Sequence, residues 1–192
     1  EDKYTDKRHP DEIKFAKTIE EDLSRRDFTI NALALKPETW SMKHKTEEGD
    51  LKSFTLHASR FKITDPFNGQ KDLENKIIKT VGQSEDRFNE DALRLMRAVR
   101  FAAELGFEIE EKTLASIKKQ AGLLEMIAKE RIKDEFEKMI MAKDVEKGIE
   151  LLESAGLLKY ITPELREGIN VKQNRHHIYT VWEHALKTLD YA

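Results

Sequence analysis

The hydrophobic pattern changes character at Gly82. Upstream of this glycine, apolar and polar residues alternate over short runs, which is typical of strands. The expected strands cover residues 53–57, a segment ending at Ile63, and residues 76–81. Downstream, apolar residues recur at every third or fourth position, which predicts helices. The expected helices cover residues 84–105, 110–120, 128–142, 144–155 and 176–191. The pattern therefore predicts an α+β fold that is mostly α, with no strand after Gly82.

Two short helices are also expected in the upstream part. One follows Glu20, where Asp22 could serve as its N-cap. The other covers residues 71–75, with Asp72 as its cap. Asp65 and Asp72 could instead hold a metal ion, but the Asp-Pro and Asn-Gly pairs between them favour a structural turn. The polar residues 38–60 are expected to form an insertion that could be a hairpin.

The predicted helix over residues 90–101 carries charged residues at every third position. Asp91, Arg94, Arg97 and Arg100 would form a slanted polar stripe along it. The opposite side is apolar and predicts a core face, made of Ala92, Leu95, Met96, Val99, Ala102 and Ala103. An acid and three arginines on one side of an otherwise apolar helix suggest a surface that binds a nucleotide.

The chemistry of this stripe favours particular bases. A carboxylate only accepts hydrogen bonds and a guanidinium only donates them, so Asp91 with Arg94 complements the amino group and ring nitrogen of cytosine or adenine. Uracil and guanine would turn a carbonyl toward the carboxylate, a mismatch on the order of 1–3 kcal/mol. Arg97 and Arg100 could reach phosphates or form the pocket wall. The alternative is an ordinary surface pair with solvated arginines.

A second charged cluster lies at residues 25–31. Arg26 could bind a triphosphate through two hydrogen bonds, and Asp27 could accept a hydrogen bond from a ribose hydroxyl. In the alternative interpretation, this is a structural Arg–Asp pair near a helix start, with Asn31 as a turn residue.

Composition limits the other classes of function. The 192 residues carry a net charge of −3 with 37% charged residues, so no basic tail binds nucleic acid without regard to sequence. The chain has no cysteine, which excludes disulfides, thiolate zinc sites and a cysteine nucleophile and fits a reducing, cytoplasmic location. No apolar run approaches the roughly 18 residues that span a bilayer. The sequence also contains no Walker A loop and no Asp-x-Asp.

Four motifs, taken in order, resemble those of class II tRNA nucleotidyltransferases, the CCA-adding enzymes of bacterial and eukaryotic type, and of their poly(A) polymerase relatives. They are Arg-Arg-Asp-Phe-Thr-Ile-Asn-Ala at 25–32, Asp-Pro-Phe-Asn-Gly-Gln-Lys-Asp-Leu at 65–73, Glu-Asp-Ala-Leu-Arg-Leu-Met-Arg-Ala-Val-Arg-Phe at 90–101, and Glu-Arg-Ile at 130–132. Residues 4–11 resemble the segment that precedes the Arg-Arg-Asp motif in that family. Residues 174–184 resemble the entry of an HD-type helical domain found in some members.

The resemblance implies three parts. Residues 1–82 would be the remnant of a nucleotidyltransferase head with a polymerase-β-like palm. Residues 83–143 would be a helical neck with the nucleotide template, and residues 144–192 the start of a helical body or HD-like domain. The family's reaction joins CTP and ATP to the 3′ end of tRNA with Mg²⁺. Its catalytic motif, a Gly turn followed by Asp-x-Asp, is not in this sequence. We therefore expect no catalytic or metal-binding residue in this chain and no nucleotide transfer by the chain alone.

The resemblance also implies the site residues. Arg26 would contact the triphosphate, with Asp27 and Asn31 at the ribose side or its support. Asp91 with Arg94 would read the base edge, and Arg97 and Arg100 would complete the pocket. CCA addition, CC-only addition, A-only addition and poly(A) addition share these motifs, so the sequence does not separate them.

Two rival interpretations belong to other classes. One is a helical RNA-binding or scaffold module that never used a nucleotide. The other is an HD phosphohydrolase, which His176, His177 and His184 would support. Unligated histidines are the favoured alternative for this trio.

Overall fold

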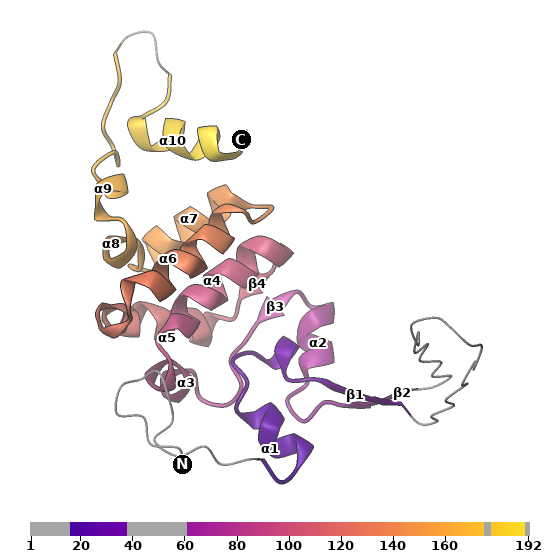
Figure 1. Cartoon of the computed structure of the whole chain (residues 1–192). Coiled ribbons are helices and arrows are strands. Elements are labelled where there is room, and N and C mark those ends of the chain that lie inside the picture. The colour runs from indigo at the N-terminus through magenta and orange to yellow at the C-terminus, as the bar shows by residue number, and fades with distance from the viewer. Residues whose placement is uncertain (1–15, 38–60, 175–177, 191–192) are drawn as a thin grey trace, which may run out of the picture.

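The computed structural model describes residues 16–37, 61–174 and 178–190 (Figure 1). Short elements come first: helix α1 (Ile19–Ser24), the 3-10 turn η1 (Thr29–Asn31), strands β1 (Ala34–Pro37) and β2 (Phe61–Thr64), helix α2 (Gly69–Glu74) and strand β3 (Ile77–Ile78). They are followed by α3 (Ser84–Glu90), α4 (Leu93–Leu105), β4 (Glu108–Ile109), α5 (Glu111–Gln120), η2 (Ala121–Met126), α6 (Lys129–Ile140), α7 (Val145–Ser154), α8 (Leu158–Ile161), α9 (Pro163–Arg166) and α10 (Val181–Asp190). The mostly helical α+β fold predicted from the sequence is confirmed.

Helix α4 is at the centre of the core, in contact with both α6 and α7 (Figure 1). Its predicted apolar side is buried at every position that the pattern assigned to it: Ala92, Leu95, Met96, Val99, Ala102 and Ala103. Gly148 of α7 allows close packing, because a Cβ there would lie 3.1 Å from the Cβ of Ala103 and 3.2 Å from the sulfur of Met139. Burial of this apolar side is the main force that holds the helices together.

The described strands form two small ladders. β1 and β2 pair antiparallel, with Leu35 opposite Ile63 and Pro37 opposite Phe61. The predicted insertion over 38–60 and the predicted strand over 53–57 lie outside the described residues. β3 pairs in parallel with β4. The expectation of no strand after Gly82 was wrong, because a two-residue strand is too short to show an alternating pattern.

The predicted helix over 84–105 is interrupted. Asp91 has an extended backbone (φ −145°, ψ 106°), and α4 restarts at Leu93. The Asp91 carboxylate favours this break. It accepts a hydrogen bond from the Leu93 N–H at 3.1 Å and forms an ion pair with Arg131 at 2.8 Å. Asp91 therefore lies at the junction of two helices and not on the same helix as Arg94, which corrects the predicted stripe.

The N-terminus of α1 is capped differently from the prediction. Thr18 is the N-cap, and its side chain accepts from the Glu21 N–H. Asp22 lies inside the helix instead. Thr18 directly precedes the first apolar residue of the helix, which is the usual position for a cap.

The start of α2 shows the same kind of correction. Asp65 accepts from the N–H groups of Gly69 at 2.7 Å and Gln70 at 3.0 Å, so it satisfies the first two orphan donors of the helix. Asp72 lies within α2 and accepts from the Thr29 hydroxyl at 2.7 Å. Both acids are thus used by the turn and its neighbour, in line with the structural interpretation of this motif.

The last described helix is shorter than predicted. α10 begins at Val181, because Thr180 and Glu183 form a capping box in which the Glu183 N–H donates to the Thr180 hydroxyl and the Thr180 N–H donates to the Glu183 carboxylate. His176 and His177 lie outside the described residues, and His184 is exposed on α10.

Candidate functional site

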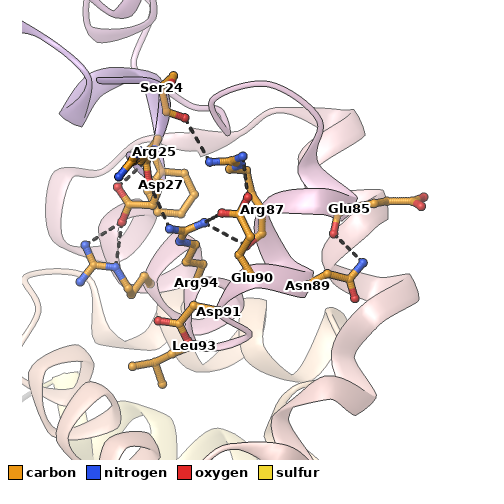
Figure 2. Close-up of polar contacts among 12 residues, drawn as sticks. Ser24, Arg25, Asp27, Glu85, Arg87, Asn89, Glu90, Asp91, Leu93 and Arg94 are labelled. Carbon is orange, nitrogen blue, oxygen red and sulfur yellow. Dashed lines mark hydrogen bonds and ion pairs between the residues drawn. The ribbon is translucent and has the colours of Figure 1, made fainter. Parts of the chain in front are cut away.

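Two motifs that are far apart in sequence meet in space. Residues 24–27, at the end of α1 and here called the 24–27 segment, lie against the α3–α4 junction (Figure 2). Arg87 donates to the Ser24 carbonyl at 3.0 Å, and Arg94 donates to the Arg25 carbonyl at 3.2 Å. Arg97 forms an ion pair with Asp27 at 2.6 Å. The α3–α4 pair therefore holds the 24–27 segment at three points, across separations of 63, 69 and 70 residues.

Asp27 is buried and fully engaged. Its Oδ2 accepts from Nε and Nη2 of Arg97 at 2.8 and 2.6 Å. Its Oδ1 accepts from the Phe28 N–H at 2.9 Å and from the Asn31 side-chain amide at 3.2 Å. A carboxylate oxygen has two lone pairs, so these four contacts use its capacity. A ribose hydroxyl would have to displace one of them, and the geometry gives Asp27 and Asn31 supporting positions.

Arg26 is exposed, as is Arg25 of the same segment. The side chain of Arg26 is 53% exposed, and its ion pair with Asp22 at 2.8 Å joins two exposed groups on the same helix end. Such a pair contributes little to stability and is easily exchanged for another anion. Arg26 is therefore well placed to bind an incoming negative group.

Asp91 keeps part of its accepting capacity. Oδ2 accepts from Arg131 and Oδ1 from the Leu93 N–H, so each oxygen has one lone pair left. Its side chain is 28% exposed. The carboxylate is held in a fixed position and can still accept from a ligand.

Arg94 keeps part of its donating capacity. Its Nη1 donates to Glu90 at 2.6 Å and to the Arg87 carbonyl at 3.1 Å, and its Nη2 donates to the Arg25 carbonyl. Three of its five N–H groups are thus used, which leaves Nε–H and one Nη2–H. A fixed acceptor and a fixed donor therefore lie within one helical junction, next to the 24–27 segment.

Arg100 points to a different neighbour. It is buried and donates through Nε to the buried Glu135 of α6 at 2.5 Å and through Nη1 to Glu104 at 2.6 Å. Its guanidinium lies 4.2 Å from the ring centre of Phe101. Burial alone would lower the pKa of Arg100, but the hydrogen bonds that it donates to Glu104 and Glu135 raise it above its usual value. Arg100 links α4 to α6, so its predicted place in a pocket stays a prediction.

Sequence reasoning did not single out Arg87. Glu90 bridges it to Arg94, since its two oxygens accept from Arg87 at 2.5 Å and from Arg94 at 2.6 Å. The spacing of three and then four residues puts these side chains on neighbouring turns, and this spacing could have indicated the cluster. Arg131, within the last motif, supports Asp91 from α6.

An open groove of about 460 Å³ lies elsewhere, between α3 and α5. It is lined by Gln83, Ser84, Glu85, Asp86, Lys112, Ala115, Ser116 and Lys119. None of the residues that meet at the 24–27 segment lines it. Its acids and lysines offset each other, so the groove has no clear preference for an anion or a cation.

The described residues include no group of three or more His, Cys, Asp or Glu side chains that could hold a metal ion. Over the same residues, no helix combines the length and the apolar character needed to cross a membrane.

Two family models match the chain. Residues 1–79 match the poly A polymerase head domain. Residues 106–169 match the probable RNA and SrmB-binding site of polymerase A.

Curated relatives are similar over most of this chain. The CCA-adding enzyme of Limosilactobacillus fermentum is 46% identical over 165 residues, which cover 86% of this chain and 36% of that protein. The CCA-adding enzyme of Leuconostoc citreum is 39% identical over 196 residues, which cover 98% of this chain and 43% of that protein. The chain thus spans well under half the length of these relatives.

Solved structures share the fold. The crystal structure of the Bacillus stearothermophilus CCA-adding enzyme in complex with CTP is 35% identical, with a TM-score of 0.65 over 81% of this chain and 34% of that one. A tRNA nucleotidyltransferase complexed with a primer tRNA and an incoming ATP analog is 26% identical, with a TM-score of 0.58 over 83% of this chain and 40% of that one.

Proposed function

Because the chain belongs to the family of CCA-adding enzymes and poly(A) polymerases, we propose that it is the nucleotide-selecting part of a template-independent RNA nucleotidyltransferase. The enzyme would add C and A to the 3′ end of tRNA, with CTP and ATP as substrates. The names of the curated relatives support the reaction, and the relatives solved with CTP and with a primer tRNA support the substrates.

One observation carries the proposal. The 24–27 segment and the α3–α4 junction, which are separated by about a third of the chain, touch through Arg94 and the Arg25 carbonyl. This contact joins the segment that carries Arg26, whose side chain is 53% exposed, to the junction that carries the fixed acceptor Asp91 and the fixed donor Arg94. An anion-binding group together with a base-reading pair is what recognition of a nucleoside triphosphate needs.

In the proposed site, Asp91 accepts from the amino group of cytosine or adenine, and Arg94 donates to the adjacent ring nitrogen. Each has hydrogen-bonding capacity left for this purpose. Uracil or guanine would bring a carbonyl to the Asp91 carboxylate. A cost of about 1–3 kcal/mol for that mismatch corresponds to about 5- to 150-fold in affinity.

The other site residues take supporting or phosphate-side roles. Arg26 binds the triphosphate, while Asp27, Asn31 and Arg97 keep the 24–27 segment in place. We keep Arg100 in the proposal as a buried brace behind the pocket. The resemblance implies Mg²⁺ held by palm carboxylates that are not in this sequence, and the described residues include no group of three or more His, Cys, Asp or Glu side chains that could hold it, so no step here uses it. A cytoplasmic location belongs to the same proposal and rests on the family resemblance.

The sequence contains no Asp-x-Asp, so the proposal assigns selection, and not bond formation, to this chain. The chain alone is expected to incorporate no radiolabelled CTP into a tRNA primer. Robust incorporation of CTP by the chain alone would contradict this assignment.

The test of base selection compares Asp91→Asn with Asp86→Asn, an exposed aspartate of α3 that serves as the matched control. A side-chain amide can donate as well as accept, so Asp91→Asn should let UTP bind and reduce the CTP-to-UTP affinity ratio by about 5-fold or more. Calorimetry of both nucleotides measures the ratio. An unchanged ratio in Asp91→Asn would rule out this carboxylate as the base reader.

Poly(A) addition is a second candidate, since both matching family models describe that class of polymerase. It predicts that ATP binds and CTP is excluded. Equal acceptance of CTP and ATP favours CCA addition, and a failure of every nucleotide to bind favours a helical RNA-binding module.

A further inference from the structure

We infer that Arg87 is a positioning residue for Arg26, a role that rests on the proposed binding of a triphosphate by Arg26. Arg87 is not a member of the base-reading pair, although it shares the Glu90 carboxylate with Arg94. It acts on the backbone two residues before Arg26, where it donates to the Ser24 carbonyl.

Glu90, Arg87 and Arg94 form a set of contacts with the end of α1, here called the bracket. The two oxygens of Glu90 accept from Arg87 at 2.5 Å and from Arg94 at 2.6 Å. The two guanidiniums then donate to successive carbonyls, Arg87 to Ser24 at 3.0 Å and Arg94 to Arg25 at 3.2 Å. Figure 2 shows these residues converging on the end of α1. One carboxylate thus orients two planar donors toward two adjacent acceptors.

The bracket supplies hydrogen-bond donors to the carbonyls at the C-terminal end of α1. The last carbonyls of a helix have no partner within it and carry a partial negative charge. α1 has only six residues and no basic residue in its last turn. The donors therefore come from α3 and α4, and they fix the direction in which the chain leaves α1.

The bracket fixes the backbone at Arg26. On its N-terminal side, the Arg26 N–H donates to the Leu23 carbonyl at 3.2 Å, within the turn that Arg87 caps. On its C-terminal side, Asp27 is fixed by Arg97. The backbone of Arg26 is held on both sides while its side chain remains 53% exposed. An anion-binding side chain on a fixed backbone loses less freedom when it binds.

The geometry of Arg87 is specific to a guanidinium. Its side chain is 20% exposed, and Nη1 and Nη2 serve different partners at the same time. A lysine would keep the charge, but its single ammonium lacks the planar fork that spans both partners. Arg87→Lys therefore tests the fork, and Arg87→Met is a second variant that removes the charge as well.

Two measurements on the full chain separate positioning from general stability. The first is amide hydrogen exchange at Arg25 and Arg26, relative to the Leu157 amide, which donates to the Leu152 carbonyl in a distant turn. The second is calorimetric affinity for CTP and for cytidine, which lacks phosphates. The matched control is Arg166→Lys, because Arg166 forms a similar two-bond pair with Glu153, at 2.7 and 3.0 Å.

Arg87→Lys should speed relative exchange at Arg25 and Arg26 by about 5-fold or more and should weaken CTP binding by about 5- to 10-fold, with cytidine binding unchanged. Arg166→Lys should change neither. Unchanged exchange at the two amides would overturn the positioning role, and so would an equal loss of CTP and cytidine affinity.

A different result would show that the proposed function, and not the positioning role of Arg87, is wrong. If exchange speeds up in Arg87→Lys but the unmodified chain binds CTP no better than cytidine, Arg87 positions the segment and the triphosphate role of Arg26 is wrong.

Discussion

Glu135 offers the sharpest test of how the site is supported. It is 3% exposed and accepts from Arg100, which is 8% exposed, so the two charges satisfy each other inside the α4–α6 contact. Removal of one partner of a buried ion pair typically costs about 3–5 kcal/mol, because the other charge stays buried. Glu104 still pairs with Arg100 at 2.6 Å and offsets part of that cost. We therefore expect Glu135→Gln to lower the free energy of unfolding by about 3 kcal/mol, a large share of the 5–15 kcal/mol of an ordinary domain.

Urea denaturation followed by circular dichroism measures this loss, and the midpoint of thermal unfolding should fall by about 6–12 °C. The control is Glu137→Gln, since Glu137 belongs to an exposed pair on the same helix and should cost under about 0.5 kcal/mol. Replacement of both partners, as Arg100→Met with Glu135→Leu, should cost less than Glu135→Gln alone, because no buried charge is left unpaired; Glu104 loses Arg100, but its side chain is 30% exposed and reaches solvent. A loss below about 1 kcal/mol in Glu135→Gln, or a double variant less stable than the single one, would refute the reasoning.

Three further predictions concern the framework. Burial would raise the pKa of Asp65, but hydrogen bonds from two N–H groups at the start of α2 lower it. Its stabilising effect is therefore present above the unfolded-state pKa and is lost as pH falls through the lower folded value. Asp65→Ala should cost about 1 kcal/mol at neutral pH, and urea titrations should show this difference vanish in acid. Gly69→Ala would put a Cβ 2.2 Å from the Thr29 carbonyl oxygen, so it should cost about 1–3 kcal/mol or more by thermal melting. The backbone N–H and hydroxyl of Thr180 lower the pKa of Glu183, so Thr180→Ala should raise that pKa in an NMR titration; no rise would contradict the capping box.

The sequence predicted what depends on periodicity and on the order of motifs. The buried side of α4 follows from the recurrence of apolar residues, and every one of its predicted core positions is buried. The contact between the 24–27 segment and the α3–α4 junction was implied by the family resemblance alone. No spacing in a sequence specifies that Arg97 will meet Asp27 across 70 residues.

The errors have a common physical origin. A periodic pattern cannot detect a local competitor for the backbone, such as the Asp91 carboxylate that interrupts the helix. Likewise, the sequence predicted Asp72 as the cap, and only the path of the turn decides that Asp65 reaches the N–H groups at the start of α2 instead. Arg100 sits in a polar stripe by spacing, yet its partner Glu135 comes from another helix and buries it.

The central claim is that this chain distinguishes bases through Asp91 and Arg94. The most direct measurement is the affinity of the unmodified chain for CTP, ATP, UTP and GTP under one set of conditions. The account predicts that CTP and ATP bind at least about 5-fold more tightly than UTP and GTP. Four equal affinities would contradict it, whatever the chain binds through Arg26.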